Sequence, residues 1–316
     1  MIQLKIYFTR AQFKVFDNAI LNELPVILPV YSIQAINHML SYQHGYHAGN
    51  FADVVKHVTL SRLLQYMIQK DKPLLYLETH SGRGMYDLKS PQALKTGEAH
   101  EGIVPLWAQR KQLPAVFSPY LKTIQQLNAG EALRYYPGSP ELAIHALRDQ
   151  DRLFFSELHS GEFDFLSQLP KQGKRVFYSE NDGLDNMAAL LPPPERRGLI
   201  FIDPSYEVKT EYRQIPLALK AAYQRFATGV YCLWYPLVDN KLHQQLIKGL
   251  TSIGAESSLR VEFYLTGADK PGMTGCGLWI INPPYVLPEE LKLVLQALRK
   301  IFNPGVSSYL METIKI

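Results

Sequence analysis

The chain has 316 residues, of which 47% are hydrophobic and 20% are charged. This length suits one large domain or two modest ones, and the frequency of Tyr, Phe and Leu excludes disorder over most of the chain. No stretch of about 18 apolar residues is free of charge and proline, which excludes a membrane-spanning helix. The two cysteines, Cys232 and Cys276, exclude a disulfide framework and a thiolate zinc site and fit a cytoplasmic protein. A net charge of +4 weakly favours a polyanionic partner.

Residues 1–38 differ from the rest of the chain. They mix apolar residues with Pro25, Pro29 and Glu23, and they lack the basic head and cleavage site of a secretory signal. We expect a poorly ordered extension, with the working domain, residues 39–316, starting at Met39. A small extra helix or strand docked on the surface is the alternative.

Five short apolar runs predict the strands of a parallel sheet. They span residues 74–78, 153–157, 176–180, 199–203 and 230–235, and the first four end in an acidic residue. Helix-like stretches such as residues 163–168 and 212–226 lie between them. Strands that alternate with helices predict βαβ units and a parallel sheet covered on both faces.

The order of elements changes near the C-terminus. Residues 260–265 and 277–281 are predicted strands joined by a short Gly/Pro-rich loop, so we expect an antiparallel hairpin. Five parallel strands followed by such a hairpin are typical of the α/β, Rossmann-like sheet of class I S-adenosylmethionine-dependent methyltransferases, whereas nicotinamide-binding domains end on a sixth parallel strand. The long interval between the first two strands predicts a helical insertion at about residues 86–132.

A glycine-containing loop follows the first predicted strand. It reads Glu78-Thr79-His80-Ser81-Gly82-Arg83-Gly84, and glycines there allow backbone groups to approach a ligand closely. A plain strand-to-helix turn is the alternative, because Gly-x-Gly is a weak motif.

Acidic residues at the ends of the next two strands fit a nucleotide-binding crevice. Glu157 would accept hydrogen bonds from ribose hydroxyls, and Asp182 with Gly183 would meet an adenine amine. Each acid could instead be a helix N-cap, and we favour that interpretation for Glu180.

Asp203-Pro204-Ser205-Tyr206 at the end of the fourth strand predicts chemistry at an exocyclic amine. Such an amine is a poor nucleophile, and the Asp203 carboxylate with the Pro204 carbonyl could accept its two N–H groups. Tyr206 offers an aromatic face for an unstacked base. A simple turn is the alternative.

A second run, Asn282-Pro283-Pro284-Tyr285, resembles an amino-methyltransferase motif more closely by letter. It follows the final antiparallel strand, however, so its end opens on the opposite edge of the sheet. We therefore interpret it as a structural turn.

Three histidines and an aspartate fall within residues 44–57. A metal site on His44 and His47 is disfavoured by their loop-like spacing. A helix that starts after Asn50 would instead carry Lys56 and His57 on its surface, either gripping a carboxylate or phosphate or forming a solvated face.

Taken together, these motifs resemble the RlmJ family of bacterial 23S rRNA adenine-N6 methyltransferases. The likeness runs from Met39 to about Pro284. It rests on Met39-Leu40-Ser41-Tyr42, His47-Ala48-Gly49-Asn50, Lys56-His57, Thr79-His80-Ser81-Gly82, Tyr135-Tyr136-Pro137-Gly138-Ser139-Pro140, Arg197-Gly198-Leu199, Phe226-Ala227-Thr228-Gly229 and Trp234-Tyr235-Pro236.

The resemblance assigns roles to individual residues. It makes Asp203 the catalytic aspartate and Tyr42 a substrate contact, and Lys56 beside these residues is expected to bind substrate as well. It also implies that the insertion contacts RNA. Two positions depart from the family pattern: Ser205 replaces a proline, which loosens the loop, and Glu78 replaces an aspartate. The implied S-adenosylmethionine contacts are His57, His80, Ser139, Glu157, Asp182, Gly183 and Asp203.

Together with these motifs, the resemblance implies transfer of a methyl group from S-adenosylmethionine to N6 of an unstacked adenine in 23S rRNA. Asp203, Pro204 and Tyr206 would form the reaction site, without a metal, in a monomer. Three alternatives stay open: an RNA-binding module with a degenerate methyltransferase fold, a DNA or small-molecule amino-methyltransferase, and, more remotely, a metal hydrolase.

Overall fold

The computed structural model describes residues 42–170, 173–267 and 272–315. The predicted N-terminal extension and the predicted start at Met39 lie outside these residues. None of the described helices is both long and apolar enough to cross a membrane.

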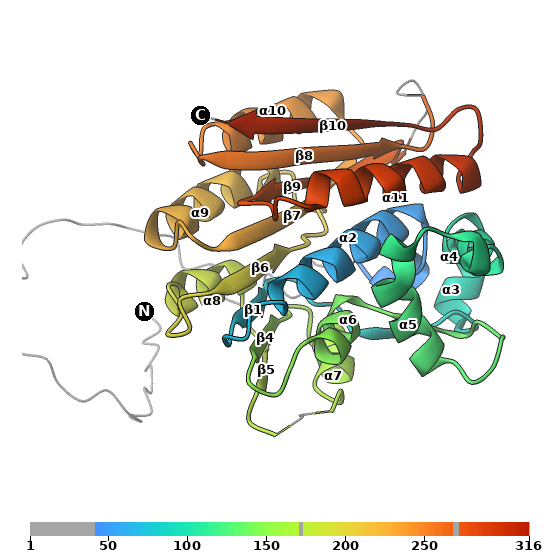
Figure 1. The fold of residues 1–316 in the computed structure, drawn as a ribbon, viewed down its shortest axis with the longest axis horizontal. Helices are drawn as coiled ribbons and strands as arrows, with labels where there is room; N and C mark the ends of the chain where they lie inside the picture. The colour runs from blue at the N-terminus through green and yellow to red at the C-terminus, as the bar shows by residue number, and fades with distance from the viewer. Residues whose placement is uncertain (1–41, 171–172, 268–271, 316) are drawn as a thin grey trace, which may run out of the picture.

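A sheet of eight strands forms the centre of the described structure, in the order β10-β8-β9-β7-β6-β1-β4-β5 (Figure 1). The strands are β1 (Leu75–Glu78), β4 (Arg152–Ser156), β5 (Val176–Ser179), β6 (Gly198–Ile202), β7 (Val230–Leu237), β8 (Ser257–Tyr264), β9 (Gly275–Ile281) and β10 (Ser308–Lys315).

Strand direction and register bring the ends of the central strands together. β5, β4, β1, β6 and β7 are parallel, and Leu77 of β1 lies between Phe154 of β4 and Ile200 of β6. β9 runs antiparallel to both β7 and β8. The predicted five parallel strands and terminal antiparallel hairpin are thus confirmed. The C-terminal ends of β1, β4, β5 and β6 share one edge of the sheet.

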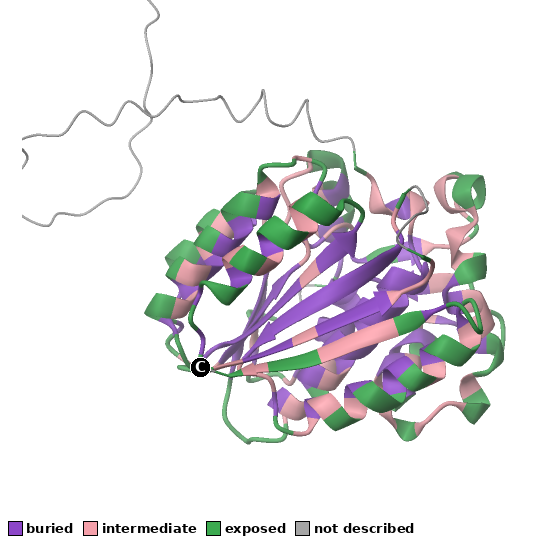
Figure 2. Cartoon of the chain, turned by 90° about the horizontal axis from the view of Figure 1, so that it is seen from above, coloured by how far each residue is buried: buried purple, intermediate pink, exposed green. Residues whose placement is uncertain are grey.

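Helices cover both faces of this sheet (Figures 1 and 2). One face is covered by α2 (Phe51–Met67), α6 (Ser139–Ala146) and α11 (Leu287–Ile301), and the other by α8 (Gly183–Leu190), α9 (Glu211–Arg225) and α10 (Asn240–Thr251). The central strands are buried on both sides, so their sequences are continuously apolar instead of alternating. A short helix, α7 (Ser160–Leu166), connects β4 to β5.

Residues between β1 and β4 add a helical layer beside α2. β2 (Met85–Asp87) and β3 (Tyr135–Pro137) pair as an antiparallel ribbon. The chain between these two strands forms α3 (Pro91–Thr96), α4 (Ile103–Ala108) and α5 (Ser118–Leu127), in the interval where the sequence predicts an insertion. The 3₁₀ turns η2 (Glu98–Glu101), η3 (Arg110–Gln112) and η4 (Ala115–Phe117) link these helices, and η1 (His44–Tyr46) precedes α2. Apolar residues such as Leu106, Tyr120 and Ile124 join the core on the α2 face.

The Asn282-Pro283-Pro284-Tyr285 run lies at the edge of the sheet opposite Asp203. The Asn282 amide donates 2.7 Å hydrogen bonds to the carbonyls of Ala227 and Gly229, which precede β7. Tyr285 is 83% exposed. The prediction that this motif is a structural turn is confirmed.

Candidate active site

Two adjoining cavities open where the parallel strands end. The first has a volume of about 190 Å³ and is lined from β1, β4, β5 and β6, and the second has a volume of about 640 Å³. They share five lining residues: Tyr42, His44, Lys56, Asp203 and Ser205. The first cavity brings together all the sequence-predicted cofactor contacts: His57, His80, Ser139, Glu157, Asp182, Gly183 and Asp203.

The loop after β1 is hydrogen-bonded to Glu157, which follows β4. The Gly82 amide donates a 2.7 Å hydrogen bond to Glu157 Oε2, and the His159 amide donates one of 2.7 Å to Oε1. Gly82 has φ of +58°, a backbone conformation that glycine adopts at little cost. Burial raises the pKa of Glu157. The two amides therefore fix the orientation of this carboxylate beside the cavity.

Gly183 forms part of a cradle between β1 and α8. A Cβ atom at this position would lie 1.9 Å from the Thr79 carbonyl oxygen, so the two backbones can approach only because residue 183 is glycine. Asp182 accepts a 2.8 Å hydrogen bond from the Leu184 amide and is the N-cap of α8. The N-cap interpretation of Glu180 is wrong, because this residue is exposed and precedes the cap.

Two histidines, His57 (buried) and His80 (half-buried), line the first cavity in the neutral form. His57 Nδ1 lies 2.8 Å from the Tyr136 hydroxyl, and burial lowers the pKa of His57 to about 3. His80 Nδ1 lies 2.7 Å from the Thr79 hydroxyl, and burial also lowers the pKa of His80. Neutral imidazoles suit a cavity for a cofactor that itself carries positive charge.

Glu78 lies behind the cavity. It is fully buried, accepts a 3.0 Å hydrogen bond from the Tyr76 hydroxyl, and also accepts one from the Ser139 hydroxyl. Burial raises its pKa well above the ordinary value, opposed by these two hydrogen bonds. Glu78 therefore positions the Ser139 side chain at the cavity wall.

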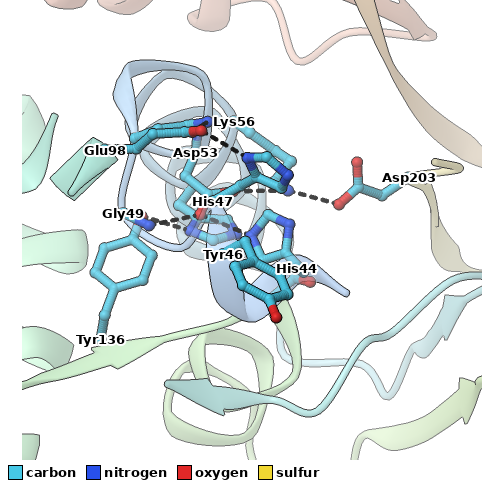
Figure 3. A network of polar contacts seen from close by, with 12 residues as sticks. His44, Tyr46, His47, Gly49, Asp53, Lys56, Glu98, Tyr136 and Asp203 are labelled. Carbon is cyan, nitrogen blue, oxygen red and sulfur yellow. Dashed lines mark hydrogen bonds and ion pairs between the residues drawn. The ribbon is translucent and has the colours of Figure 1, made fainter. Parts of the chain in front are cut away.

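Lys56 connects α2 to the end of β6. Its Nζ lies 2.6 Å from Asp203 Oδ2 and 2.9 Å from Asp53 Oδ1 (Figure 3). Burial alone would lower the pKa of Lys56, but the two carboxylates raise it above its ordinary value. The side chains of Lys56 and Asp53 are 6% and 2% exposed, so the solvated-face interpretation of this helix is wrong. Asn50 is its N-cap, as predicted.

The segment before α2 forms a polar network around Asp53 and Glu98 (Figure 3). Asp53 Oδ2 lies 2.8 Å from His44 Nε2, and Glu98 Oε1 lies 2.7 Å from His47 Nδ1. Tyr42 stacks on His47, with ring centroids 5.6 Å apart. His44 and His47 thus pair with different carboxylates. Over the ranges that the structure describes, no group of three or more potential metal ligands occurs.

The loop after β6 forms the boundary between the cavities. Asp203 and Ser205 line both, whereas Pro204 and Tyr206 line only the second. Tyr206 is 7% exposed and has φ of +54°, an uncommon conformation for a bulky residue that often occurs at functional sites. Its hydroxyl donates a 3.3 Å hydrogen bond to the Trp234 carbonyl.

Several cavity residues were not predicted as site residues. The sequence pattern presents His44 only as a possible metal ligand, although this residue lines both cavities. Glu98 lies in the insertion, and no motif in the sequence around it indicates a site residue. Its contacts with His47 and Asn50, which are about 50 residues away in the sequence, form only when the chain folds. Trp234 lies in the fifth predicted strand and could have been found as an aromatic residue near the end of that strand.

In the strand order β5-β4-β1-β6-β7-β9-β8, β9 lies between β7 and β8 and runs antiparallel to both. Nicotinamide-binding domains instead end on a sixth parallel strand. Together with the glycine cradle and the acids at the strand ends, this order defines a class I S-adenosylmethionine-dependent methyltransferase. Residues 71–313 match the family model described as "Ribosomal RNA large subunit methyltransferase D, RlmJ". The chain belongs to this family, and its cofactor is S-adenosylmethionine.

Individual relatives agree with this assignment. The chain is 42% identical over 268 residues to the "Ribosomal RNA large subunit methyltransferase J" of Escherichia coli, covering 84% of this chain and 95% of the relative. It is 43% identical over 279 residues to the protein of the same name from Haemophilus influenzae, covering 87% and 99%. A solved structure from Legionella pneumophila matches with a TM-score of 0.81 and 55% identity, covering 84% of this chain and 98% of that one.

Proposed function

We propose that this protein transfers a methyl group from S-adenosylmethionine to N6 of an unstacked adenine in 23S rRNA. The observation that carries the proposal is the position of Asp203, which lines both cavities at the end of β6. A carboxylate there lies between a cofactor in the first cavity and a nucleotide in the second.

The first cavity fits the cofactor by the polar groups that line it. Glu157 would accept hydrogen bonds from the ribose, and Asp182 beside Gly183 would meet the adenine amine. His57, His80 and Ser139 contribute neutral polar groups to the walls. When bound, the cofactor supplies an electrophilic methyl group on a sulfonium.

Asp203 and Pro204 would activate the target amine. The lone pair of an adenine amine is delocalised into the ring, so the nitrogen attacks poorly. A carboxylate and a backbone carbonyl that accept its two N–H groups favour a pyramidal nitrogen and stabilise the positive charge that develops on it. Most of the rate enhancement would come from this positioning and electrostatic preorganisation.

Lys56 would hold the catalytic carboxylate in place. Its Nζ binds Asp203 Oδ2, which leaves Oδ1 for the substrate amine, and Asp53 holds the ammonium group from the other side. A lysine between two carboxylates also partly compensates the negative charge at a site that must accept RNA.

The second cavity fits the target nucleotide. Its volume of about 640 Å³ falls in the range of small-molecule sites, and Tyr206, Tyr212 and Trp234 provide aromatic surface against which an unstacked base can pack. Tyr42 lines both cavities and would contact the substrate from the segment before α2. Lys209 adds positive charge for the phosphate.

Substitution of Asp203 tests this proposal. We expect Asp203→Ala and Asp203→Asn to abolish methylation of 23S rRNA, because the first removes the acceptor for the amine and the second replaces the carboxylate with a neutral amide that does not stabilise the developing positive charge. Methylation is followed by mass spectrometry of the digested RNA. Binding of S-adenosylhomocysteine, followed by calorimetry, should remain measurable in both variants. Full activity in either variant would contradict the role of Asp203.

The choice of substrate distinguishes the alternatives. Transfer of a labelled methyl group to 23S rRNA should exceed transfer to duplex DNA or free adenosine. Preferred transfer to either of those would identify an amino-methyltransferase of another kind. Binding of 23S rRNA without any transfer would identify an RNA-binding module instead.

A further inference from the structure

His159 lies between the end of β4 and the first turn of α7. Its Nδ1 accepts hydrogen bonds from the Gly161 amide at 3.1 Å and the Glu162 amide at 3.4 Å. The side chain is therefore the N-cap of α7. Histidine is an unusual residue for this role, because Asn, Asp, Ser and Thr cap helices more effectively.

These two hydrogen bonds fix the tautomer of the ring. A nitrogen that accepts from backbone amides carries no proton, so in the neutral ring the proton lies on Nε2. The helix amides are bonded to Nδ1 alone, so Nε2 is the ring nitrogen that the cap leaves free to donate. Among the hydrogen bonds of the described residues, none involves this N–H group, and His159 lines the first cavity.

Glu157 and His159 line the same cavity, and the Glu157 carboxylate is hydrogen-bonded to the His159 backbone. Its Oε2 accepts from the Gly82 amide and its Oε1 from the His159 amide, so the carboxylate and the ring are both held by backbone hydrogen bonds. The wall thus presents a fixed acceptor two residues from a fixed donor. Two vicinal hydroxyls, each of which can donate and accept, are complementary to such a pair.

We propose that His159 recognises the ribose of the cofactor, donating from Nε2 to one ribose hydroxyl while Glu157 accepts from the other. The inference rests on the assignment of Glu157 under the proposed function. It adds a residue that selects a ribonucleoside over its deoxy counterparts. A histidine at this cap is then explained, because the better-capping residues do not place a donor at the position of Nε2.

The test separates capping from recognition. His159→Asp and His159→Asn each keep an oxygen that can cap α7 but remove the ring N–H group. Binding of S-adenosylhomocysteine and of its 2′-deoxy and 3′-deoxy analogues is measured by calorimetry. We expect both variants to bind S-adenosylhomocysteine at least tenfold more weakly than the unsubstituted protein and to discriminate less between the ribose and deoxy forms. Their thermal midpoints should match that of the unsubstituted protein.

A matched control is His145→Asn on α6, because His145 Nδ1 is bonded to a backbone carbonyl and the residue does not line the first cavity. This variant should bind all three ligands unchanged. If the His159 variants bind within twofold of the unsubstituted protein and keep its discrimination, His159 is only a cap and the inference is wrong. If the unsubstituted protein does not bind S-adenosylhomocysteine, both this inference and the proposed function are wrong. If it binds normally but does not methylate 23S rRNA, only the proposed function is wrong.

Discussion

At the scale of single residues, the central feature is the lysine held between two carboxylates. The spacing of Asp53 and Lys56 on one helix is visible in the sequence, because residues three apart lie on the same face. The contact with Asp203 is not, since 147 residues separate it from Lys56 and only the fold brings α2 to the end of β6. For the same reason the sequence could not distinguish a buried helix face from a solvated one.

The buried His57 makes stability depend on pH. Burial lowers the pKa of His57 to about 3, whereas in the unfolded chain it titrates near its ordinary value. The unfolded state therefore binds a proton first, and stability should fall as pH drops below about 6.5 by roughly 1.4 kcal/mol per pH unit. We expect a loss of roughly 1.4 kcal/mol from this residue between pH 7.5 and pH 5.5.

Urea unfolding at these two pH values checks this expectation in the unsubstituted protein and in His57→Gln. The variant should lose less stability on acidification. His80, whose pKa is also lowered, and His47 and His145, whose pKa values are raised by Glu98 and Glu141, titrate in both proteins, so their effects cancel in the comparison. An identical pH dependence in the two proteins would show that His57 is protonated at little cost.

At the scale of elements, the apolar runs that form buried strands were the most predictable part of the fold. β1 and β6 are buried along their whole length, so their sequences contain no alternation and stand out from the helices. β10 was not predicted, because as an edge strand it is only partly buried and its sequence is mixed. The ribbon of β2 and β3 was too short to recognise, since each strand has three residues.

The helical layer between β2 and β3 is where we expect RNA to be contacted beyond the target nucleotide. The Arg110 guanidinium lies over the Trp107 ring, 4.5 Å from its centroid, and pairs with Glu131. Lys111 lies beside it, with its Nζ 3.9 Å from the same carboxylate; its side chain is 81% exposed, which makes it the better candidate for a phosphate contact. Lys111→Ala should therefore weaken binding to 23S rRNA and reduce the salt dependence of log K by about one unit.

Affinity measured by filter binding over a series of salt concentrations checks the Lys111 prediction. Lys248→Ala on α10 is the control, because this exposed lysine lies on the other face of the sheet. Equal effects of the two substitutions would indicate only a general response to net charge.

At the scale of the whole molecule, the helical layer and the sheet share one hydrophobic core. Trp107, Phe117 and Ile124 from that layer pack in the same cluster as α2 and the strands, and a second core lies on the opposite face under α9 and α10. Because neither face of the sheet can be exposed without the loss of a core, we expect the described chain to unfold in one cooperative transition.

The three tryptophans provide probes for this cooperativity. Trp107 lies in α4, Trp234 near the cavities in β7 and Trp279 in the second core. In variants that keep one tryptophan and carry phenylalanine at the other two positions, the fluorescence midpoint in urea should equal the far-ultraviolet circular dichroism midpoint of the same variant. A lower fluorescence midpoint for the Trp107 probe alone would mean that the helical layer unfolds independently.

The last strand determines how the protein can be handled on a solid support. β10 is antiparallel to β8, and Lys315 at its end lies opposite Ser257, where β8 begins. β8 points the same way as β7, since both are antiparallel to β9, so Lys315 lies at the edge of the sheet away from both cavities. A protein immobilised through a residue at this end of β10 would therefore present its cavities to the surrounding solution, away from the support.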